Sequence, residues 1–327
     1  MHMANISPTA PAALNDRISS AVRAGLNCHP RSLPPWLFYD EAGSRLFDQI
    51  TQLPEYYLTR TERAIFASHA PAILAQAARG ARLRIAELGA GSADKTRLIL
   101  AAASLQQGSV LYEPVDVSAS ALTLAAARIT REMPAIVVAP RVMDYTLHLA
   151  LDPPALDEHW LVLYIGSSIG NFEPDAALRL LTQIRTALKP GDALLLGVDM
   201  VKDIPTLLAA YNDAAGVTAA FNRNVLVRLN RELDADFRIE AFAHRALWNA
   251  TESRIEMHLE SLNRQSVHLG ALDLTLHFAP GERIHTENSY KYRPGQAEAL
   301  LTAAGFCPEA AWTDDAVWFS VLLARVA

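Results

Sequence analysis

The feature that most constrains the fold is a regular alternation of short apolar runs and longer amphipathic segments between Arg82 and Met200. Each run has the length of a strand, and the segment after it has helical periodicity. Parallel strands need long crossover connections, which are usually helices, so the alternation predicts a parallel sheet covered on both faces. The predicted strands are LRIAEL, VLYEPVDV, AIVVAP, HWLVLYIG and ALLLGVDM.

This alternation of predicted strands and helices ends after Met200. A helical segment follows, and the run RIEMHLESL then places Ile255, Met257 and Leu259 on one strand face. The later run LDLTLHF alternates in the same way, and the two runs predict an antiparallel insertion with one buried face. The last segment, WTDDAVWFSVLLARV, predicts a hairpin that returns to the main sheet. We therefore expect an α/β fold with two domains. The core domain comprises residues 61–200 and 288–327, and the second, α+β domain comprises residues 18–60 and 201–287.

The stretch from Leu33 to Tyr57 is rich in aromatic residues and predicts short helices and loops. Thr59 and Glu62 follow it with the spacing of a capping box, in which a threonine and a glutamate cap the same helix start. This spacing predicts that a helix begins at Thr59.

Charge and apolar content limit the partners. The 327 residues carry a net charge of -6, which argues against nucleic acid as a partner. The apolar runs are too short to cross a bilayer, and MHMANISPTA lacks the regions of a signal peptide. Cys28 and Cys307 form no disulfide or zinc pattern, and we expect both to be small apolar fillers. We expect a cytoplasmic protein, monomeric, with neither a membrane nor a nucleic-acid partner.

The segment IAELGAGSADKT joins the first predicted strand to a helix. Gly89 and Gly91 allow a tight turn and a close approach of the backbone to a ligand. Asp94 occupies the place of the third glycine of a dinucleotide fingerprint, which argues against a dehydrogenase, and Lys95 lacks the spacing of a phosphate-binding loop. A purely structural turn would explain two glycines equally well.

Acidic residues at the strand ends add weight to a ligand site. Glu87 ends the first strand, Asp116 ends the second, where a carboxylate can accept both hydroxyls of a ribose, and Asp144 and Tyr145 follow the third. Each alone is more simply a satisfied polar residue. Together they match the layout of class I S-adenosylmethionine-dependent methyltransferases, whose ligand carries no phosphate and needs no cluster of arginines.

The sequence from about Leu33 onward resembles the histidine Nα-methyltransferases of ergothioneine biosynthesis. The segments that carry the resemblance are FYDEAGSRLFDQITQLPEYYLTRTE, ELGAGSADKTRLIL, PVDVSASAL, IGSSIGNFEP, DMVKD, YNDAAGVTAAFNRNV, RIEMHL and TENSYKY. The resemblance implies a Rossmann-like core with a substrate-binding second domain. It also implies three methyl transfers from S-adenosylmethionine to the α-amine of L-histidine, which give hercynine and S-adenosylhomocysteine without a metal.

The resemblance also implies roles for individual residues. The expected cofactor-binding residues are Glu87, Gly89, Gly91, Lys95, Asp116, Asp144 and Tyr145. The expected substrate-binding residues are Phe47, Tyr56, Asn171, Tyr211, Met257, Glu287 and Ser289, and the expected catalytic residues are Tyr39 and Gly166. Tyr57 is the alternative to its neighbour Tyr56. Tyr39 and solvent are both candidates for accepting the amine proton.

The polar cluster TENSYKY suits an imidazole. Glu287 can accept from a ring N–H, the Ser289 hydroxyl can donate or accept, and strand alternation turns Asn288 away from both. Asn171 and Tyr211 offer donors to the substrate carboxylate, and Met257 is by default a core residue. The plain alternative for the cluster is a hairpin edge that faces water.

Other functions remain open at this point. An enzyme for another aromatic amino acid, such as tryptophan, is disfavoured because an indole edge would leave the Glu287 carboxylate poorly satisfied. A non-catalytic protein that binds S-adenosylmethionine is the third possibility. The glycine loop together with the polar cluster argues against it.

Overall fold

The computed structural model describes residues 11–91 and 93–326, and the expectation about a signal peptide falls on residues outside these ranges. The chain divides into two compact units. We call Tyr57–Lys202 with Tyr290–Ala327 the core unit, and Met1–Tyr56 with Asp203–Ser289 the second unit.

The core unit is built on a sheet that has eight strands among the described residues, with the order β13-β14-β7-β6-β2-β3-β4 and β5 paired to β3. The strands are β2 (Arg82–Leu88), β3 (Val110–Asp116), β4 (Ile136–Val138), β5 (Arg141–Val142), β6 (Glu158–Tyr164), β7 (Ala193–Asp199), β13 (Cys307–Thr313) and β14 (Phe319–Arg325). Strands β2 to β7 pair in parallel, and β14 adds antiparallel to β7. The predicted parallel sheet and its terminal hairpin are confirmed.

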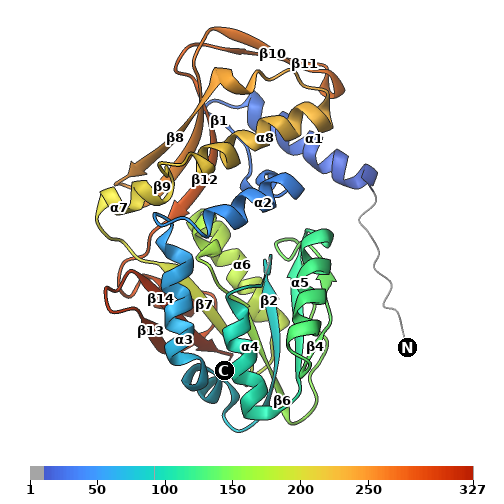
Figure 1. Ribbon diagram of the computed structural model, residues 1–327, viewed down its shortest axis with the longest axis vertical. Helices are drawn as coiled ribbons and strands as arrows, with labels where there is room; N and C mark the ends of the chain where they lie inside the picture. Colours follow the sequence, from blue (N-terminus) through green and yellow to red (C-terminus); the bar gives the residue numbers. More distant parts are fainter. Residues whose placement is uncertain (1–10, 92, 327) are drawn as a thin grey trace. The chain divides into compact units, whose positions relative to one another are not determined.

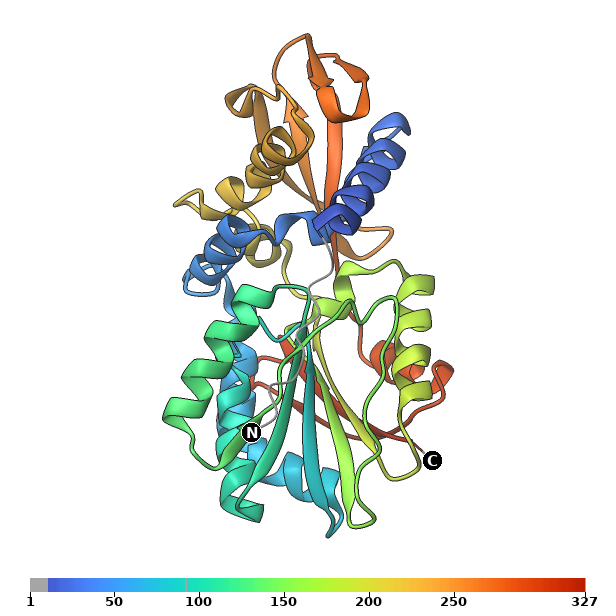
Figure 2. The same cartoon turned by 90° about the vertical axis from the view of Figure 1, so that its right-hand side faces the viewer.

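Helices cover both faces of this sheet, as Figure 2 shows. They are α3 (Tyr57–Ala78), α4 (Thr96–Gln107), α5 (Ala119–Glu132), α6 (Pro174–Ala187) and α9 (Gln296–Ala303), with the 3₁₀ helix η2 (Ser168–Asn171) after β6. Leu83 and Ile85 of β2 pack in the apolar cluster that contains α3, α4 and α5, whereas Ala86 and Leu88 pack on the side of α6 and α9. A doubly covered parallel sheet is the architecture that the alternation predicted.

Over the described part of the chain, the second unit combines helices with a four-stranded sheet of order β1-β12-β9-β8. Its strands are β1 (Arg31–Ser32), β8 (Phe242–Asn249), β9 (Arg254–Ser261) and β12 (Arg283–Tyr290), and β10 (Gln265–Leu269) pairs with β11 (Leu274–Phe278) in a separate ribbon. Its helices are α1 (Pro11–Asn27), α2 (Glu41–Ile50), α7 (Ile204–Ala210) and α8 (Val217–Leu233), with 3₁₀ turns η1 (Pro35–Phe38), η3 (Ile239–Ala241) and η4 (Gly270–Leu272). Helix α8 packs against β8 and β9 and against α2 (Figure 1).

Strand β9 shows the expected alternation, because Ile255, Met257 and Leu259 are all buried. The antiparallel pairing of β9 with β8 confirms the predicted insertion. That this unit binds the substrate stays a prediction.

Two expectations from the sequence are wrong. Helix α3 begins at Tyr57, so Thr59 lies inside it and the capping box does not form. Glu62 is instead fully buried, because its carboxylate has partners elsewhere in the core unit. Cys28 follows the end of α1, and Cys307 begins β13, the outermost strand of its sheet; both are exposed, so neither is an apolar filler.

Candidate active site

The glycine loop lies between β2 and α4, at the carboxyl end of the parallel sheet. Gly89 and Gly91 have φ angles of +71° and +50°, in the region that residues with a side chain rarely adopt. A Cβ on Gly89 would also lie 3.2 Å from the Tyr145 hydroxyl. The two glycines therefore form the turn that the sequence predicted, with the Tyr145 side chain beside it.

Asp116 ends β3 next to this loop. Its Oδ2 accepts a hydrogen bond from the Gly91 N–H at 3.0 Å, and its Oδ1 accepts one from the Ser118 N–H at 2.9 Å. Burial raises the pKa of the carboxyl, against the lowering effect of these backbone donors. Each carboxylate oxygen keeps further acceptor capacity, so Asp116 can hold the loop and still accept ligand hydroxyls.

Glu87 is 3% exposed and lies one residue before the end of β2. One oxygen accepts from the Thr96 hydroxyl at 2.6 Å, and the other accepts from the Tyr112 hydroxyl. Burial raises the pKa of Glu87 to about 7. These contacts link β2, β3 and the start of α4, so Glu87 stabilises the glycine loop between β2 and α4.

Asp144 and Tyr145 follow β5. Asp144 Oδ1 accepts from the Thr146 N–H at 3.0 Å and from the Thr146 hydroxyl at 2.5 Å. The Tyr145 ring meets Tyr164 edge-on, with 5.9 Å between centroids, and burial raises the pKa of its phenol. The structure thus places Tyr145 and Gly89 close together, as a cofactor site would require.

Lys95 and Gly166 both contact Glu62, the residue that the sequence assigned to a helix cap. The Lys95 Nζ lies 2.7 Å from Glu62 Oε2, and Glu62 Oε1 accepts from the Gly166 N–H at 2.8 Å. A Cβ on Gly197 of β7 would lie 2.3 Å from Glu62 Oε1, so the strand needs glycine beneath the carboxylate. The sequence signal for Glu62 was its capping-box spacing from Thr59, which gave no indication of these contacts.

Asn171 ends the 3₁₀ helix η2, in the loop that follows β6, and it is half-buried. Ser167 precedes this turn with a φ angle of +59°, and its hydroxyl accepts from the Asp199 N–H at 2.9 Å. A Cβ on Gly170 would lie 2.9 Å from the Tyr290 carbonyl oxygen. The turn that carries Asn171 is therefore fixed by β7 and by the end of β12.

A second cluster in the core unit was not predicted. Asp199, at the end of β7, is fully buried and accepts from the Tyr57 hydroxyl at 2.7 Å. The ammonium groups of Lys202 and Lys291 lie 2.6 and 2.7 Å from its two oxygens. Burial lowers the pKa of Lys202 to about 8. Because the Tyr57 hydroxyl is bound within this cluster, Tyr56 is the better candidate for substrate contact.

Within the second unit, four of the predicted residues form a chain of aromatic contacts. The ring centroids of Tyr39 and Phe47 lie 5.8 Å apart, those of Phe47 and Tyr56 lie 6.3 Å apart, and those of Tyr56 and Tyr211 lie 6.3 Å apart. Phe221 of α8 contacts both Tyr39 and Phe47, and the sequence did not single it out. The four residues come from separate segments, so the fold brings them together.

The chain of aromatic contacts continues into β12. The Tyr211 hydroxyl lies 2.7 Å from Ser289 Oγ, and both residues are buried, as is Glu287 with 8% exposure. The Thr286 hydroxyl lies 3.0 Å from the Met257 carbonyl oxygen, so β9 and β12 meet beside Glu287. The polar cluster is buried among protein atoms, and the alternative of an edge that faces water is wrong.

Asn288 Oδ1 lies 2.8 Å from His285 Nε2 of the same strand. That Asn288 points away from Glu287 and Ser289 stays a prediction.

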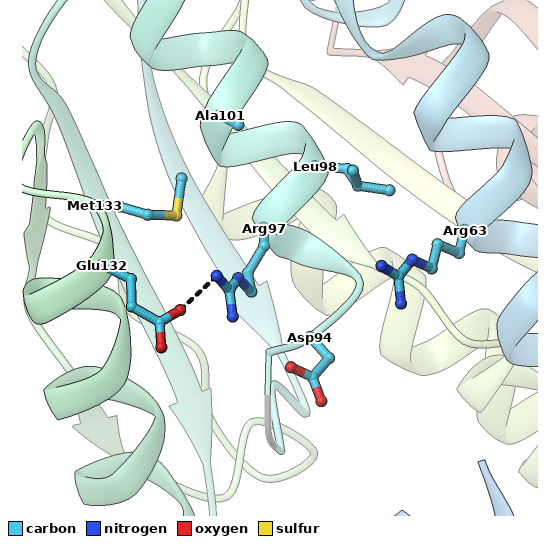
Figure 3. Close-up of a pocket in the computed structure, with 7 residues that line it drawn as sticks. All are labelled: Arg63, Asp94, Arg97, Leu98, Ala101, Glu132 and Met133. Atoms are coloured by element: carbon cyan, nitrogen blue, oxygen red, sulfur yellow. Dashed lines mark ion pairs between the residues drawn. The ribbon is translucent and has the colours of Figure 1, made fainter. Parts of the chain in front are cut away.

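A surface pocket of the core unit lies beside the start of α4 (Figure 3). Its lining residues are Arg63, Asp94, Arg97, Leu98, Ala101, Glu132 and Met133. Arg97 is already paired with Glu132, and Asp94 with Arg128. The pocket contains none of the predicted site residues, and we assign it no role.

Among residues 11–91 and 93–326, no group of three or more histidine, cysteine, aspartate or glutamate side chains is arranged to hold a metal ion. Over the same part of the chain, no helix has the length and apolar character needed to cross a membrane.

Comparison with known proteins gives a consistent result. Residues 18–326 match the family described as histidine-specific methyltransferase, SAM-dependent. The histidine N-alpha-methyltransferase of Mycolicibacterium smegmatis is 48% identical over 303 residues, which cover 93% of each chain, and that of Mycobacterium tuberculosis is 46% identical with the same coverage. Ergothioneine biosynthesis protein 1 of Neurospora crassa is 31% identical over 87% of this chain and 32% of its own length.

Proposed function

The chain belongs to the SAM-dependent, histidine-specific methyltransferases, and on this basis we propose that it transfers methyl groups from S-adenosylmethionine to the α-amine of L-histidine. The observation that carries the proposal is the match to this family over residues 18–326, together with a buried carboxylate, Glu287, in the strand expected to read the imidazole.

The residues at the end of the parallel sheet fit S-adenosylmethionine. When bound, this cofactor supplies an electrophilic methyl carbon on a sulfonium. The Lys95 ammonium suits the carboxylate of its methionine portion, and Asp116 suits its ribose hydroxyls. Gly91 leaves open space beside the backbone, since a Cβ there would meet no protein atom within 4 Å, and Gly89 permits the turn. Glu87 supports this loop through Thr96 and Tyr112, and Tyr145, which follows Asp144 in the chain, flanks it.

The second unit provides the histidine contacts in this proposal. Glu287 accepts from an imidazole N–H, which is a charge-assisted hydrogen bond in a buried setting, and Ser289 binds the same ring. Tyr56, Phe47 and Met257 supply apolar surface for the side chain.

The amino-acid end of the substrate is assigned to hydroxyl and amide donors. Tyr211 is proposed to donate to its carboxylate, and the same role stays a prediction for Asn171. The α-amine must be neutral to attack, and orientation supplies much of the rate in such displacements. Tyr39 or solvent takes the amine proton, and the backbone at Gly166 lines the reaction site.

We further propose that three successive transfers give hercynine, as a step toward ergothioneine, and that the protein acts as a cytoplasmic monomer. A relative named for ergothioneine biosynthesis supports the pathway part of this proposal.

Mass spectrometry of histidine incubated with the protein and S-adenosylmethionine tests the function directly. The expected product carries three added methyl groups on the α-nitrogen. A product with fewer methyl groups would correct the number of transfers, and an unchanged histidine would refute the function. Histidinol, which lacks the carboxylate, is expected to be a much poorer substrate. Equal turnover of the two would remove Asn171 and Tyr211 from the carboxylate site.

A further inference from the structure

Tyr211 makes one hydrogen bond through its side chain and another through its main chain. Its hydroxyl contacts Ser289 Oγ directly at 2.7 Å. Its carbonyl oxygen lies 2.8 Å from Nε2 of His244, a residue of β8. The first contact lies in the proposed histidine site, and the second begins a path through residues with no role so far.

That path continues through Asn222 of α8 and returns to β12. Asn222 Nδ2 lies 2.9 Å from His244 Nδ1, and Asn222 Oδ1 accepts from the Thr286 hydroxyl at 2.8 Å. Thr286 and Ser289 lie on either side of Glu287 in the strand. These contacts, together with the main chain of β12 from Thr286 to Ser289, form a closed circuit of Tyr211, His244, Asn222, Thr286 and Ser289, and all five residues are buried.

One further contact fixes which groups of this circuit donate hydrogen bonds and which accept them. Asn222 Nδ2 also donates to the His258 carbonyl oxygen at 3.1 Å, which can only accept, so the amide nitrogen must face that way. The Thr286 hydroxyl has one proton and two acceptors, Asn222 Oδ1 at 2.8 Å and the Met257 carbonyl oxygen at 3.0 Å, and the shorter contact is the one to Asn222. His244 Nδ1 must then accept, which leaves its proton on Nε2, where it donates to Tyr211.

Burial favours the neutral ring that this arrangement requires. It lowers the pKa of His244, against the raising effect of the Tyr211 carbonyl. A proton on Nδ1 would place two donors face to face between His244 and Asn222. Buried polar groups that lose their partners are costly, so the contact between His244 and Asn222 has one stable arrangement.

We propose that His244 is a positioning residue for histidine binding, which holds Tyr211 against Ser289 through the closed circuit with Asn222 and Thr286. The residue does not touch the substrate in this proposal. It fixes the main chain at Tyr211, while Asn222 fixes the strand that carries Glu287. The inference rests on the proposed function and adds to it the residues that set substrate affinity.

Three substitutions at His244 separate its two contacts. Phenylalanine in His244→Phe keeps a flat ring and removes both. Glutamine in His244→Gln places an amide donor near the position of Nε2, whereas asparagine in His244→Asn places an amide acceptor near that of Nδ1. We expect His244→Phe to raise the KM for histidine on the order of tenfold, as the loss of one or two buried hydrogen bonds would. The affinity for S-adenosylmethionine, measured by calorimetry, should not change.

The test is the ranking of the variants by their KM for histidine. His244→Gln should restore part of the histidine affinity, because it keeps the donor to Tyr211, and His244→Asn should not. Thr286→Val removes the hydroxyl that contacts Asn222 and leaves His244 unchanged. It should also raise the KM for histidine, and it provides the test if His244→Phe does not fold. Combined with His244→Phe, it should add little.

Asn230→Ala is the matched control. Like Asn222, Asn230 is an asparagine of α8. Its side chain makes hydrogen bonds to the main chain of Phe237, and it lies outside the circuit. This variant should lose stability without a change in histidine KM. If His244→Phe behaves like Asn230→Ala, or if its affinities for histidine and S-adenosylmethionine fall together, the positioning role is refuted.

A measurement on the wild-type protein keeps this inference distinct from the proposed function. Nitrogen-15 NMR of the His244 ring, without substrate, should show a protonated Nε2 and an unprotonated Nδ1 at neutral pH. The other tautomer would overturn the circuit even if the enzyme methylates histidine. The expected tautomer with no methylation of histidine would instead refute the proposed function alone.

Discussion

Glu62 and Lys95 form an ion pair in the core unit, with 2.7 Å between Oε2 and Nζ. The Glu62 carboxylate is fully buried, whereas the Lys95 side chain is 24% exposed. The same carboxylate accepts from the Gly166 N–H, so it connects the end of the glycine loop to the turn after β6. A buried anion thus holds a cation at the proposed cofactor site.

Glu62→Gln tests the importance of this pair. The amide keeps one acceptor but turns a donor toward either Lys95 or Gly166, so it cannot satisfy both groups. We expect the affinity for S-adenosylmethionine to fall by about tenfold, in line with the loss of one charge-assisted hydrogen bond. Calorimetry checks this, with Glu132→Gln as the control, because Glu132 makes only exposed pairs with Arg97 and Arg131. Unchanged cofactor affinity would show that Lys95 needs no such partner.

Asp116→Ala should weaken the binding of S-adenosylmethionine while histidine binding stays largely intact. The variant loses the proposed contacts to the ribose and also the acceptor for the Gly91 N–H. A charged hydrogen bond contributes about 1.5–3 kcal/mol, which corresponds to about 10- to 150-fold in affinity. Titration of each ligand separately provides the measurement, and an unaltered cofactor affinity would remove Asp116 from the site.

Glu287→Ala should lower the specificity for histidine by roughly 10- to 150-fold, because one charge-assisted hydrogen bond to the imidazole is lost. Activity on tryptophan should fall less or even rise, since no buried carboxylate then faces the indole. Shortening Met257 as well should strengthen this trend. Steady-state kinetics on both amino acids decide the matter, and equal proportional losses would mean that Glu287 supports the fold without reading the imidazole.

Tyr211→Phe and Ser289→Ala should each raise the KM for histidine, and their effects should not add. The two hydroxyls contact each other at 2.7 Å, so removing one already disturbs the other. A double-mutant cycle on histidine binding should give a coupling energy of about 0.5–1.5 kcal/mol, the range of a neutral hydrogen bond. Simple additivity would indicate that the two residues bind the substrate independently.

Glu87 should make the protein less stable as the pH rises. Its pKa is raised from an ordinary 4.5 to about 7 in the folded protein, so between these values the folded state binds more protons than the unfolded state. The free energy of unfolding should fall across this window, by up to about 3 kcal/mol from this group. Glu87→Gln should remove that part of the pH dependence. Urea unfolding of both proteins, at about pH 4.5 and about pH 8, checks the prediction, and a pH-independent difference between them would contradict it.

Local patterns in the sequence were enough for much of the fold. The five predicted strands correspond to β2, β3, β4, β6 and β7, and the glycine loop lies where the segment IAELGAGSADKT placed it. These features depend on which face of a segment is buried and on backbone conformations that only glycine adopts easily. Both the buried face and the glycine conformation can be recognised from a few consecutive residues. The roles of the individual site residues came from resemblance, and they stay predictions.

The sequence by itself thus determined the doubly covered sheet and the position of its loop. Only the tertiary structure decided the partners of buried polar groups. The spacing of Thr59 and Glu62 predicted a cap, but Glu62 pairs with Lys95, because α3 packs beside the end of the sheet. The circuit through His244 and Asn222 likewise joins a strand, a helix and a loop. A side chain takes whichever buried partner the fold brings within hydrogen-bond reach, and spacing along the chain does not encode that partner.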